Sequence, residues 1–329
     1  MTDLAAKYAQ LVSFDPATSS SRLALSRLRE LILLEGLPDG QAGTELRPVV
    51  WKLLLHLHRV PASASSSVHP LLCADQYLDL VQRGPSRMFQ KIRNDAFRTL
   101  ATDKDFQDKV SEDTLVRVLE AFVWRQFDLG DGDGDDDSST AVPYVQGLNV
   151  LAAPFLSVLP SELEAWACFT TFVESHAPRY VRPTLVGVHD GLQLVDECLV
   201  SLDPELYAHL ARSRLSAELY AFPSILTVSA ATRPLSEVVQ WWDFLLAHGG
   251  VGVNVLAVVA QLVLVRDDLV SNANVSTTKT KQLVRTFPPL SARDVIPLVV
   301  KFVAELDPLL YDQVVRHPWD DQWREHHRT

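Results

Sequence analysis

Apolar residues recur every three or four positions through most of the chain, the spacing that places side chains on one face of an α-helix. One such series is Leu115, Val116, Leu119, Phe122 and Val123, and another is Leu163, Trp166, Phe169 and Val173. The run from Val251 to Val265 is apolar almost throughout. Because two polar residues interrupt it and it is too short to span a bilayer, it indicates a helix buried in a core.

Polar residues mark where these helices begin and end. Ser161 and Glu164 have the spacing of a capping box, and Asp203 precedes a proline at the first helical position. A helix over 238–247 should close at Gly249, and Ser291 should start a last helix that bends near Pro297. No pair of segments alternates like paired strands, so we predict an all-α fold.

Three segments lack helical periodicity, namely 61–67, 128–140 and 271–280. The second carries six aspartates between 128 and 137 with interleaved glycines, and we expect it to be mobile. It does not fit a calcium-binding loop. With Asp131 at position 1, Asp136 would stand where glycine is required and Val142 where the glutamate is required.

Composition and charge narrow the class of protein. The chain has 329 residues and a net charge of −11, which disfavours nucleic acid or an anionic membrane as its general partner. Cys73, Cys168 and Cys198 are widely spaced and are interpreted as reduced structural thiols. We find no secretory signal, phosphate-binding loop, nucleophile elbow or zinc motif, and hence no recognisable enzyme site.

Two polar clusters stand in apolar surroundings. In residues 92–100, Asp95 and Arg98 are three positions apart on a helix and can pair, which would fix the direction of the guanidinium. In residues 144–149, Gln146 stands beside a glycine, after a loop and before an apolar run. Taken singly, the first cluster is best explained as a surface ion pair and the second as a polar helix start.

Taken together and in order, these clusters resemble a known family. The blocks are Arg47 to Trp51; Ile92, Asp95, Arg98 and Thr99; Tyr144, Gln146, Gly147, Leu148 and Asn149; then Pro234-Leu235 and Trp242-Asp243. They are similar to the signature blocks of the TBC domain, a Rab-GAP-type GTPase-activating domain, over roughly residues 28–270. The resemblance implies an all-α domain of two helical subdomains with a groove for a small GTPase. Residues 1–27 would then be an N-terminal arm, and 271–329 a C-terminal helical extension packed on the domain.

The resemblance also implies roles for these residues. Arg98 and Gln146 would be the catalytic pair that enters the active site of a Ras/Rab-like GTPase, while Asp95, Thr99, Tyr144 and Gly147 support and orient them. The members expected to be structural are Arg47, Trp51, Trp242 and Asp243. GTP and Mg would be bound by the partner GTPase. We therefore expect no cofactor or metal in this chain and no substrate turnover of its own.

The short chain and the blocks around Asp95 and Gln146 resemble, more narrowly, the TBC subunit of the fungal spindle-position checkpoint. That subunit works with a scaffold partner as a two-component GAP that restrains mitotic exit or septation. The resemblance implies a cytoplasmic protein held at the spindle pole body through a partner, without membrane insertion. The alternative is a catalytically silent TBC module that docks a GTPase or scaffold, and the presence of both Arg98 and Gln146 favours activity. A helical scaffold unrelated to GTPases would require the ordered blocks to be coincidence.

Two segments depart from the family pattern. One is the acidic insertion, and the other is Phe222 to Ala231, where many members have a tryptophan and a Thr-Leu-Phe run. Because the second region contributes to GTPase contact in relatives, its departure bears on the choice of partner and leaves the chemistry untouched.

Overall fold

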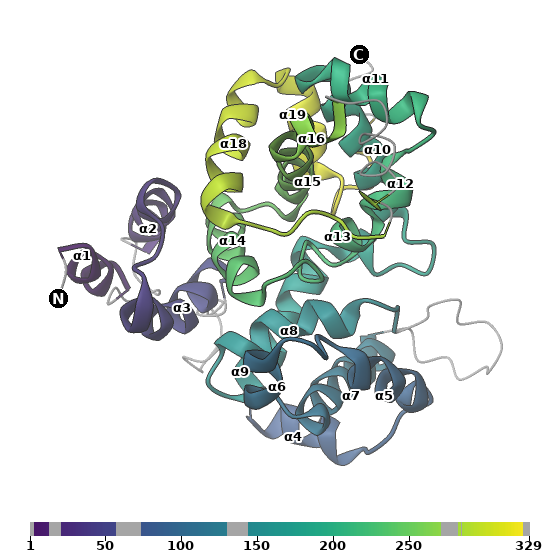
Figure 1. Ribbon diagram of the computed structural model, residues 1–329. Helices are drawn as coiled ribbons and strands as arrows, with labels where there is room; N and C mark the ends of the chain where they lie inside the picture. The colour runs from purple at the N-terminus through teal and green to yellow at the C-terminus, as the bar shows by residue number, and fades with distance from the viewer. Residues whose placement is uncertain are drawn as a thin grey trace. The chain divides into compact units, whose positions relative to one another are not determined.

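The computed structural model describes residues 3–12, 21–56, 74–129, 144–270, 282–283 and 285–324 (Figure 1). In these ranges all regular secondary structure is helical and no strand occurs, which confirms the all-α prediction. The chain divides into two compact units. Unit 1 comprises Met1–Glu174 and Trp242–Gly249, and unit 2 comprises Ser175–Trp241 and Gly250–Thr329. The boundaries 1–27, 28–270 and 271–329 follow the family resemblance and stay a prediction, and the acidic insertion lies almost wholly outside the described residues.

The helices of unit 1 are α1 (Asp3–Val12), α2 (Ser21–Glu35), α3 (Gly40–Leu54), α4 (Ala74–Gln82), α5 (Phe89–Arg98), α6 (Lys104–Lys109), α7 (Glu112–Leu129), α8 (Leu148–Val158) and α9 (Glu162–Thr171). A π-helical turn, η2 (Phe172–His176), follows α9. Helix α7 packs against α4, α5, α8 and α9. Its buried side chains include the predicted Leu115, Leu119, Phe122 and Val123.

The helices of unit 2 are η3 (Pro178–Tyr180), α10 (Val186–Leu202), α11 (Pro204–Arg212), α12 (Ala217–Tyr220), α13 (Phe222–Leu226), η4 (Val251–Val253), α15 (Asn254–Leu264), α16 (Arg266–Val270), α18 (Ala292–Glu305) and α19 (Pro308–Arg316). Helix α14 (Leu235–His248) contributes residues to both units. Residues 254–262 of α15 are all buried, and this helix contacts both α10 and α18. The prediction of a buried helix from the apolar run after residue 250 is therefore confirmed.

The predicted helix boundaries are confirmed where capping chemistry indicated them. The Ser161 hydroxyl accepts from the Glu164 N–H at 3.2 Å, and Asp203 accepts from the Leu206 N–H at 3.0 Å. Gly249 closes α14 with a φ of +90°, a conformation that glycine adopts without strain. Cys168 and Cys198 are buried free thiols, and no helix among the described residues is long and apolar enough to cross a membrane.

A buried carboxylate organises the aromatic core of unit 1. Asp243 is 4% exposed and accepts two hydrogen bonds from Arg47 Nε, each 2.9 Å long. Trp51 Nε1 donates to the same carboxylate at 2.7 Å. Trp51 packs against Phe155 and Trp242 with ring centroids 5.6 and 5.9 Å apart. The four residues expected to be structural therefore meet in one place, where the arginine and the tryptophan donate to a carboxylate that is almost wholly removed from water.

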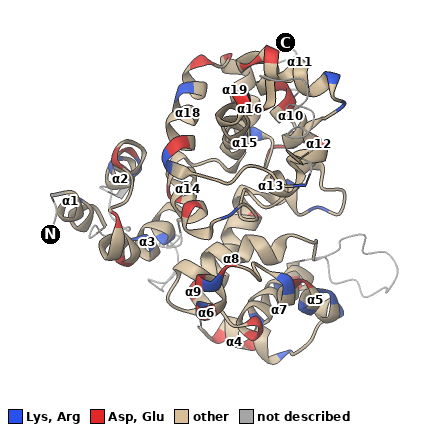
Figure 2. Cartoon of the chain, in the orientation of Figure 1, with Lys and Arg blue, Asp and Glu red and all other residues tan. Residues whose placement is uncertain are grey.

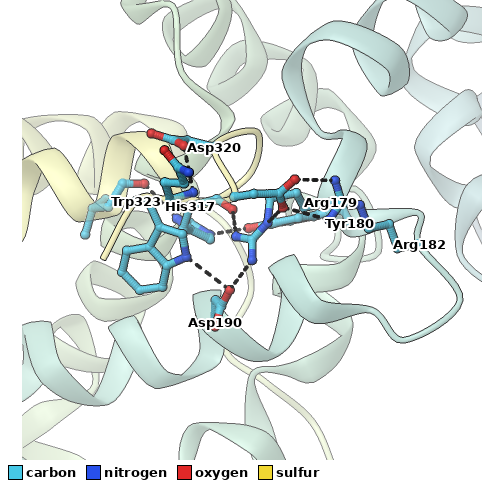
Figure 3. Close-up of polar contacts among 10 residues, drawn as sticks. Arg179, Tyr180, Arg182, Asp190, His317, Asp320 and Trp323 are labelled. Carbon is cyan, nitrogen blue, oxygen red and sulfur yellow. Dashed lines mark hydrogen bonds and ion pairs between the residues drawn. The ribbon is translucent and has the colours of Figure 1, made fainter. Parts of the chain in front are cut away.

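A second network in unit 2 ties the end of the chain to α10 and η3 (Figure 3). The buried guanidinium of Arg179 donates to Asp190 at 2.7 Å, to Asp321 at 3.0 Å and to the His317 carbonyl at 2.5 Å. Trp323 Nε1 donates to the same carboxylate of Asp190 at 3.2 Å. Residues 317–323 are thus held by charge-assisted hydrogen bonds to residues more than 120 positions earlier in the chain.

Replacing Arg47 by alanine is expected to lower the free energy of unfolding by about 3–5 kcal/mol, because it leaves the buried Asp243 carboxylate without its cation. Urea denaturation of parent and variant measures the difference. The matched control is Arg83→Ala in the same unit. It removes an ion pair with Asp128 in which both side chains are well exposed, and should cost under about 1 kcal/mol. Equal losses in the two variants would contradict the structural role of Arg47.

A pH dependence is expected at His317. Its Nδ1 lies 2.8 Å from the Val314 carbonyl, which only accepts, so Nδ1 carries the hydrogen and Nε2 accepts from the Tyr180 hydroxyl at 2.8 Å. Burial lowers the pKa of His317 to about 4, so the unfolded chain takes up the proton first as the pH falls. The contribution of this group to the free energy of unfolding is fully present above pH 6.5. It is lost as the pH falls from 6.5 to 4, which lowers the free energy of unfolding by about 3 kcal/mol.

Denaturation at pH 7, 5.5 and 4 tests this dependence in the parent and in His317→Gln, whose side-chain oxygen can still accept from Tyr180. The variant should lose less stability than the parent over this range. The control is His189→Asn, which alters a half-exposed histidine of the same unit. If the parent and His317→Gln lose equal stability, the pKa of His317 does not lie where its burial indicates.

Candidate functional site

The two polar clusters singled out in the sequence meet at the carboxylate of Asp95. Asp95 lies in the last two turns of α5 and is 4% exposed. Arg98 Nη2 donates to its Oδ1 at 2.5 Å, and the Tyr144 hydroxyl donates to its Oδ2 at 3.0 Å. Each oxygen of the buried carboxylate therefore has a donor, one from its own helix and one from a residue 49 positions later in the chain.

The backbone around Asp95 is bound in the same way. Its carbonyl oxygen accepts from the Thr99 hydroxyl at 2.8 Å and from Asn149 Nδ2 at 3.3 Å. Asn149 Nδ2 also donates to Thr99 Oγ1 at 2.8 Å, and Asn149 Oδ1 accepts from the Gly147 N–H at 3.2 Å. Asn149 thereby joins the end of α5 to the start of α8. Asn149 is the last residue of the third block, and its position as a polar residue at the start of an apolar helix is the sequence signal for this role.

Gly147 allows the sharp change of direction at the start of α8. Its φ of +106° lies in the left-handed region, where a side chain would be strained, and it is the residue that precedes the helix. Tyr144, Val145 and Gly147 are buried, whereas Gln146 between them is exposed. The buried neighbours fix the backbone on both sides, so the turn presents the glutamine side chain outward.

Arg98 and Gln146 are polar side chains that this arrangement leaves accessible. Arg98 is the last residue of α5, and its side chain is 59% exposed although one terminal nitrogen is bound to Asp95. A guanidinium has five N–H donors, so several remain for another acceptor. Within the described part of the chain, the carboxamide of Gln146 makes no hydrogen bond. The structure thus brings the predicted supporting residues together around two exposed side chains, whose catalytic roles stay a prediction.

Tyr144 is held in its neutral, donating form. Burial and the neighbouring charge of Asp95 raise the pKa of its phenol well above the ordinary value. Lys91 lies against the other side of this residue, with Nζ 3.3 Å from the Tyr144 carbonyl and 5.5 Å from the ring centroid. The Asp95–Tyr144 hydrogen bond therefore persists throughout the physiological pH range.

The segment Phe222 to Ala231, which departs from the family pattern, lies in unit 2 and is mostly buried. Asn254 Oδ1 accepts from Ser229 Oγ at 2.8 Å and from Trp241 Nε1 at 3.1 Å, while Asn254 Nδ2 donates to the Ser224 carbonyl at 3.1 Å. These polar groups are committed to holding the segment, and its influence on partner choice stays a prediction. Among the described residues, no group of three or more His, Cys, Asp or Glu is arranged to hold a metal ion.

Replacing Tyr144 by phenylalanine is expected to lower the free energy of unfolding by about 1–3 kcal/mol, because one oxygen of the buried Asp95 carboxylate loses its donor. The matched control is Tyr77→Phe in the same unit. Tyr77 donates to Glu162 at 3.2 Å, but that carboxylate is a third exposed and also bound by Arg117, so the cost should be smaller. Urea denaturation measures both. A Tyr144→Phe variant as stable as the parent would show that Asp95 is satisfied in another way.

Comparison with known proteins places the chain in a family. The model of the Rab-GTPase-TBC domain matches residues 44–270. Cell division control protein 16 of Schizosaccharomyces pombe is 39% identical over 299 residues, which cover 91% of this chain and 89% of that protein. Mitotic check point protein BUB2 of Saccharomyces cerevisiae is 38% identical over 303 residues, covering 90% and 92%.

Solved structures agree on the fold. The Ypt/Rab-GAP domain of Gyp1p superimposes with a TM-score of 0.70 at 18% sequence identity, over 92% of this chain and 97% of that one. At this identity the likeness shows the fold alone, whereas the family model and the two fungal relatives match this chain in amino-acid sequence over most of its length. The ordered blocks, the helical fold and the match over most of the chain's length lead to one conclusion: this chain belongs to the Rab-GTPase-TBC (RabGAP-TBC) domain family.

Proposed function

We propose that this chain is a GTPase-activating protein that supplies Arg98 and Gln146 in trans to a Ras/Rab-like small GTPase. The observation that carries the proposal is the hydrogen-bond network of Asp95. It connects the arginine block to the glutamine block within unit 1, buries the supporting groups and leaves the two reactive side chains exposed. A network that only stabilised the fold would have no need to leave a cation and a carboxamide at the surface.

Arg98 has the chemistry of an arginine finger. Hydrolysis spreads negative charge over the γ-phosphoryl oxygens, and a guanidinium delivered by another protein neutralises it. Such a finger is worth on the order of 10³–10⁵ in rate, or roughly 4–7 kcal/mol of barrier. Asp95 holds one nitrogen of Arg98 and so limits the directions in which the side chain can point. Less conformational freedom is then lost when the guanidinium meets the phosphate.

Gln146 has the chemistry needed to orient the attacking water. Its carbonyl oxygen can accept from the water while its amide donates to the phosphate. The left-handed turn at Gly147 and the buried Tyr144 position its backbone. The nucleotide and its Mg²⁺ would be bound by the GTPase, so the chain would need no cofactor and would turn over no substrate of its own.

The relatives support a cell-cycle role. The two fungal proteins are named for cell division control and the mitotic checkpoint, and each matches this chain over about nine-tenths of its length. We propose that the chain acts with a scaffold subunit as a two-component GAP that restrains mitotic exit or septation. Its site of action would be the spindle pole body, reached from the cytoplasm through that partner.

Single-turnover GTP hydrolysis by candidate small GTPases, with and without the scaffold subunit, tests the catalytic proposal. Arg98→Ala should lower the stimulated rate by at least about 100-fold, and Gln146→Ala by roughly 10- to 100-fold, because each removes a group that contacts the transition state. Gln146 is exposed, so the thermal midpoint of Gln146→Ala should stay near that of the parent. Arg98→Ala removes a donor from the buried Asp95 carboxylate and should lower the midpoint, so its rate is measured at a temperature where the variant is fully folded. The matched controls are Arg22→Ala and Gln193→Ala, which remove exposed residues elsewhere and should leave the rate unchanged.

The outcomes separate the two interpretations of the family resemblance. If Arg98→Ala and Gln146→Ala stimulate hydrolysis as well as the parent, the proposed catalytic roles are wrong. If the parent binds the GTPase in its GTP form but does not accelerate hydrolysis, even with the scaffold, the chain is a silent binding module.

A further inference from the structure

The segment that carries Arg98 is basic in an otherwise acidic chain. The whole sequence has a net charge of −11, yet residues 83–104 contain six basic and two acidic residues. Both acids are engaged within the fold, since Asp95 is buried and Asp103 caps α6 by accepting from the Phe106 N–H at 3.0 Å. Figure 2 shows the basic residues gathered on and around α5. Arg83 pairs with Asp128 and Arg93 pairs loosely with Glu112, so part of this charge is compensated within the fold. The net positive charge of the segment still suits an acidic partner surface better than a basic one.

An exposed aromatic side chain adjoins Arg98. Phe97 is 77% exposed, the highest value among the large hydrophobic side chains of the described residues. The inward face of α5 is formed by Ile92, Asp95 and Ala96, and helical geometry directs Phe97 away from it. Single exposed hydrophobic residues are common, but this one shares a helical turn with the proposed arginine finger.

The position of Phe97 limits what can cover it. Successive side chains on a helix point about 100° apart, so a protein that brings a nucleotide phosphate to Arg98 can contact Phe97 with an adjoining part of its surface. Arg93 lies one turn before Phe97 and is 56% exposed, with a long 3.5 Å pairing to Glu112. An incoming partner would thus meet an apolar anchor and a basic side chain beside the proposed finger.

We propose that Arg93 and Phe97, together called the α5 face, select the GTPase partner. The partner fitted by this surface is a small GTPase with an apolar depression beside its nucleotide, rimmed by acidic side chains. This inference rests on the proposed function, which it extends from chemistry to recognition. Phe97 contributes affinity, because an aromatic ring buries about 150–250 Å² and is a typical centre of binding energy at interfaces. Arg93 contributes association rate, because its charge steers an acidic surface toward the site.

The test measures binding and hydrolysis separately. A panel of Ras- and Rab-type GTPases loaded with the non-hydrolysable analogue GppNHp is screened for binding to the full chain, and the tightest binder serves as the probe. Phe97→Ala should raise its Kd by about 30-fold, while the single-turnover rate at saturating chain changes by less than about threefold. Phe97→Leu should recover part of the affinity. The control Leu34→Ala removes a side chain of unit 1 that is 75% exposed, and should leave Kd unchanged.

The contribution of charge is read from kinetics. Arg93→Glu should lower the association rate constant about tenfold at 50 mM salt, and the difference should shrink at 500 mM because exposed charges are then screened. The control Arg22→Glu makes the same charge change on an exposed residue of α2. We leave Lys91 unaltered because it contacts Tyr144, so that its replacement would disturb the Asp95 network as well.

The outcomes distinguish this inference from the proposed function. If Phe97→Ala leaves Kd unchanged while Arg98→Ala abolishes acceleration, the α5 face does not select the partner and the catalytic proposal stands. If Phe97→Ala weakens binding but Arg98→Ala hydrolyses as fast as the parent, recognition stands and the catalytic proposal falls. The absence of any GTPase that binds in the panel would overturn the inference.

Discussion

The hydrogen bonds to the buried carboxylate of Asp95 are the interaction on which the candidate site depends. A carboxylate removed from water must be paired and fully hydrogen-bonded, or it destabilises the fold. Arg98 and Tyr144 satisfy its two oxygens, while Thr99 and Asn149 bind the adjacent backbone. The requirement to satisfy one charge thereby fixes the end of α5 against the start of α8. Arg98 and Gln146 owe their positions to these two helix ends.

Each unit also contains another buried charged group that is paired and hydrogen-bonded, but in these clusters the cation is not left exposed. Asp243 is enclosed by Arg47 and Trp51 in the core of unit 1, and Arg179 is enclosed by acceptors in unit 2. In those two clusters the cation is also largely buried, at 15% and 5% side-chain exposure. At Asp95 the carboxylate is buried, but the side chain of its arginine is 59% exposed. Two of these pairs are therefore suited to stability alone, and the third leaves its cation able to contact another molecule.

The charge of the segment around Arg98 and the exposed ring of Phe97 are consistent with a surface that contacts another molecule. The acidic chain as a whole would repel an acidic partner, so a basic segment at the proposed site supplies local attraction. The exposed ring of Phe97 adds a short-range apolar contact that a charged surface alone would lack. Steering by charge and anchoring by an aromatic side chain act on different rate constants, and proteins commonly combine them at interfaces.

The sequence by itself determined the helices, their caps and the order of the family blocks, because these depend on neighbours within one or two turns. It also predicted that Asp95 and Arg98 pair, since they are three residues apart on one helix. Only the tertiary structure decided that Tyr144 completes this pair, that Asn149 joins α5 to α8, and that Arg47 reaches Asp243, 196 positions away in the chain. It also decided that Phe97 stays exposed. The physical reason is that periodicity shows which face of a helix is apolar, whereas the partner of a buried polar group depends on how distant helices pack.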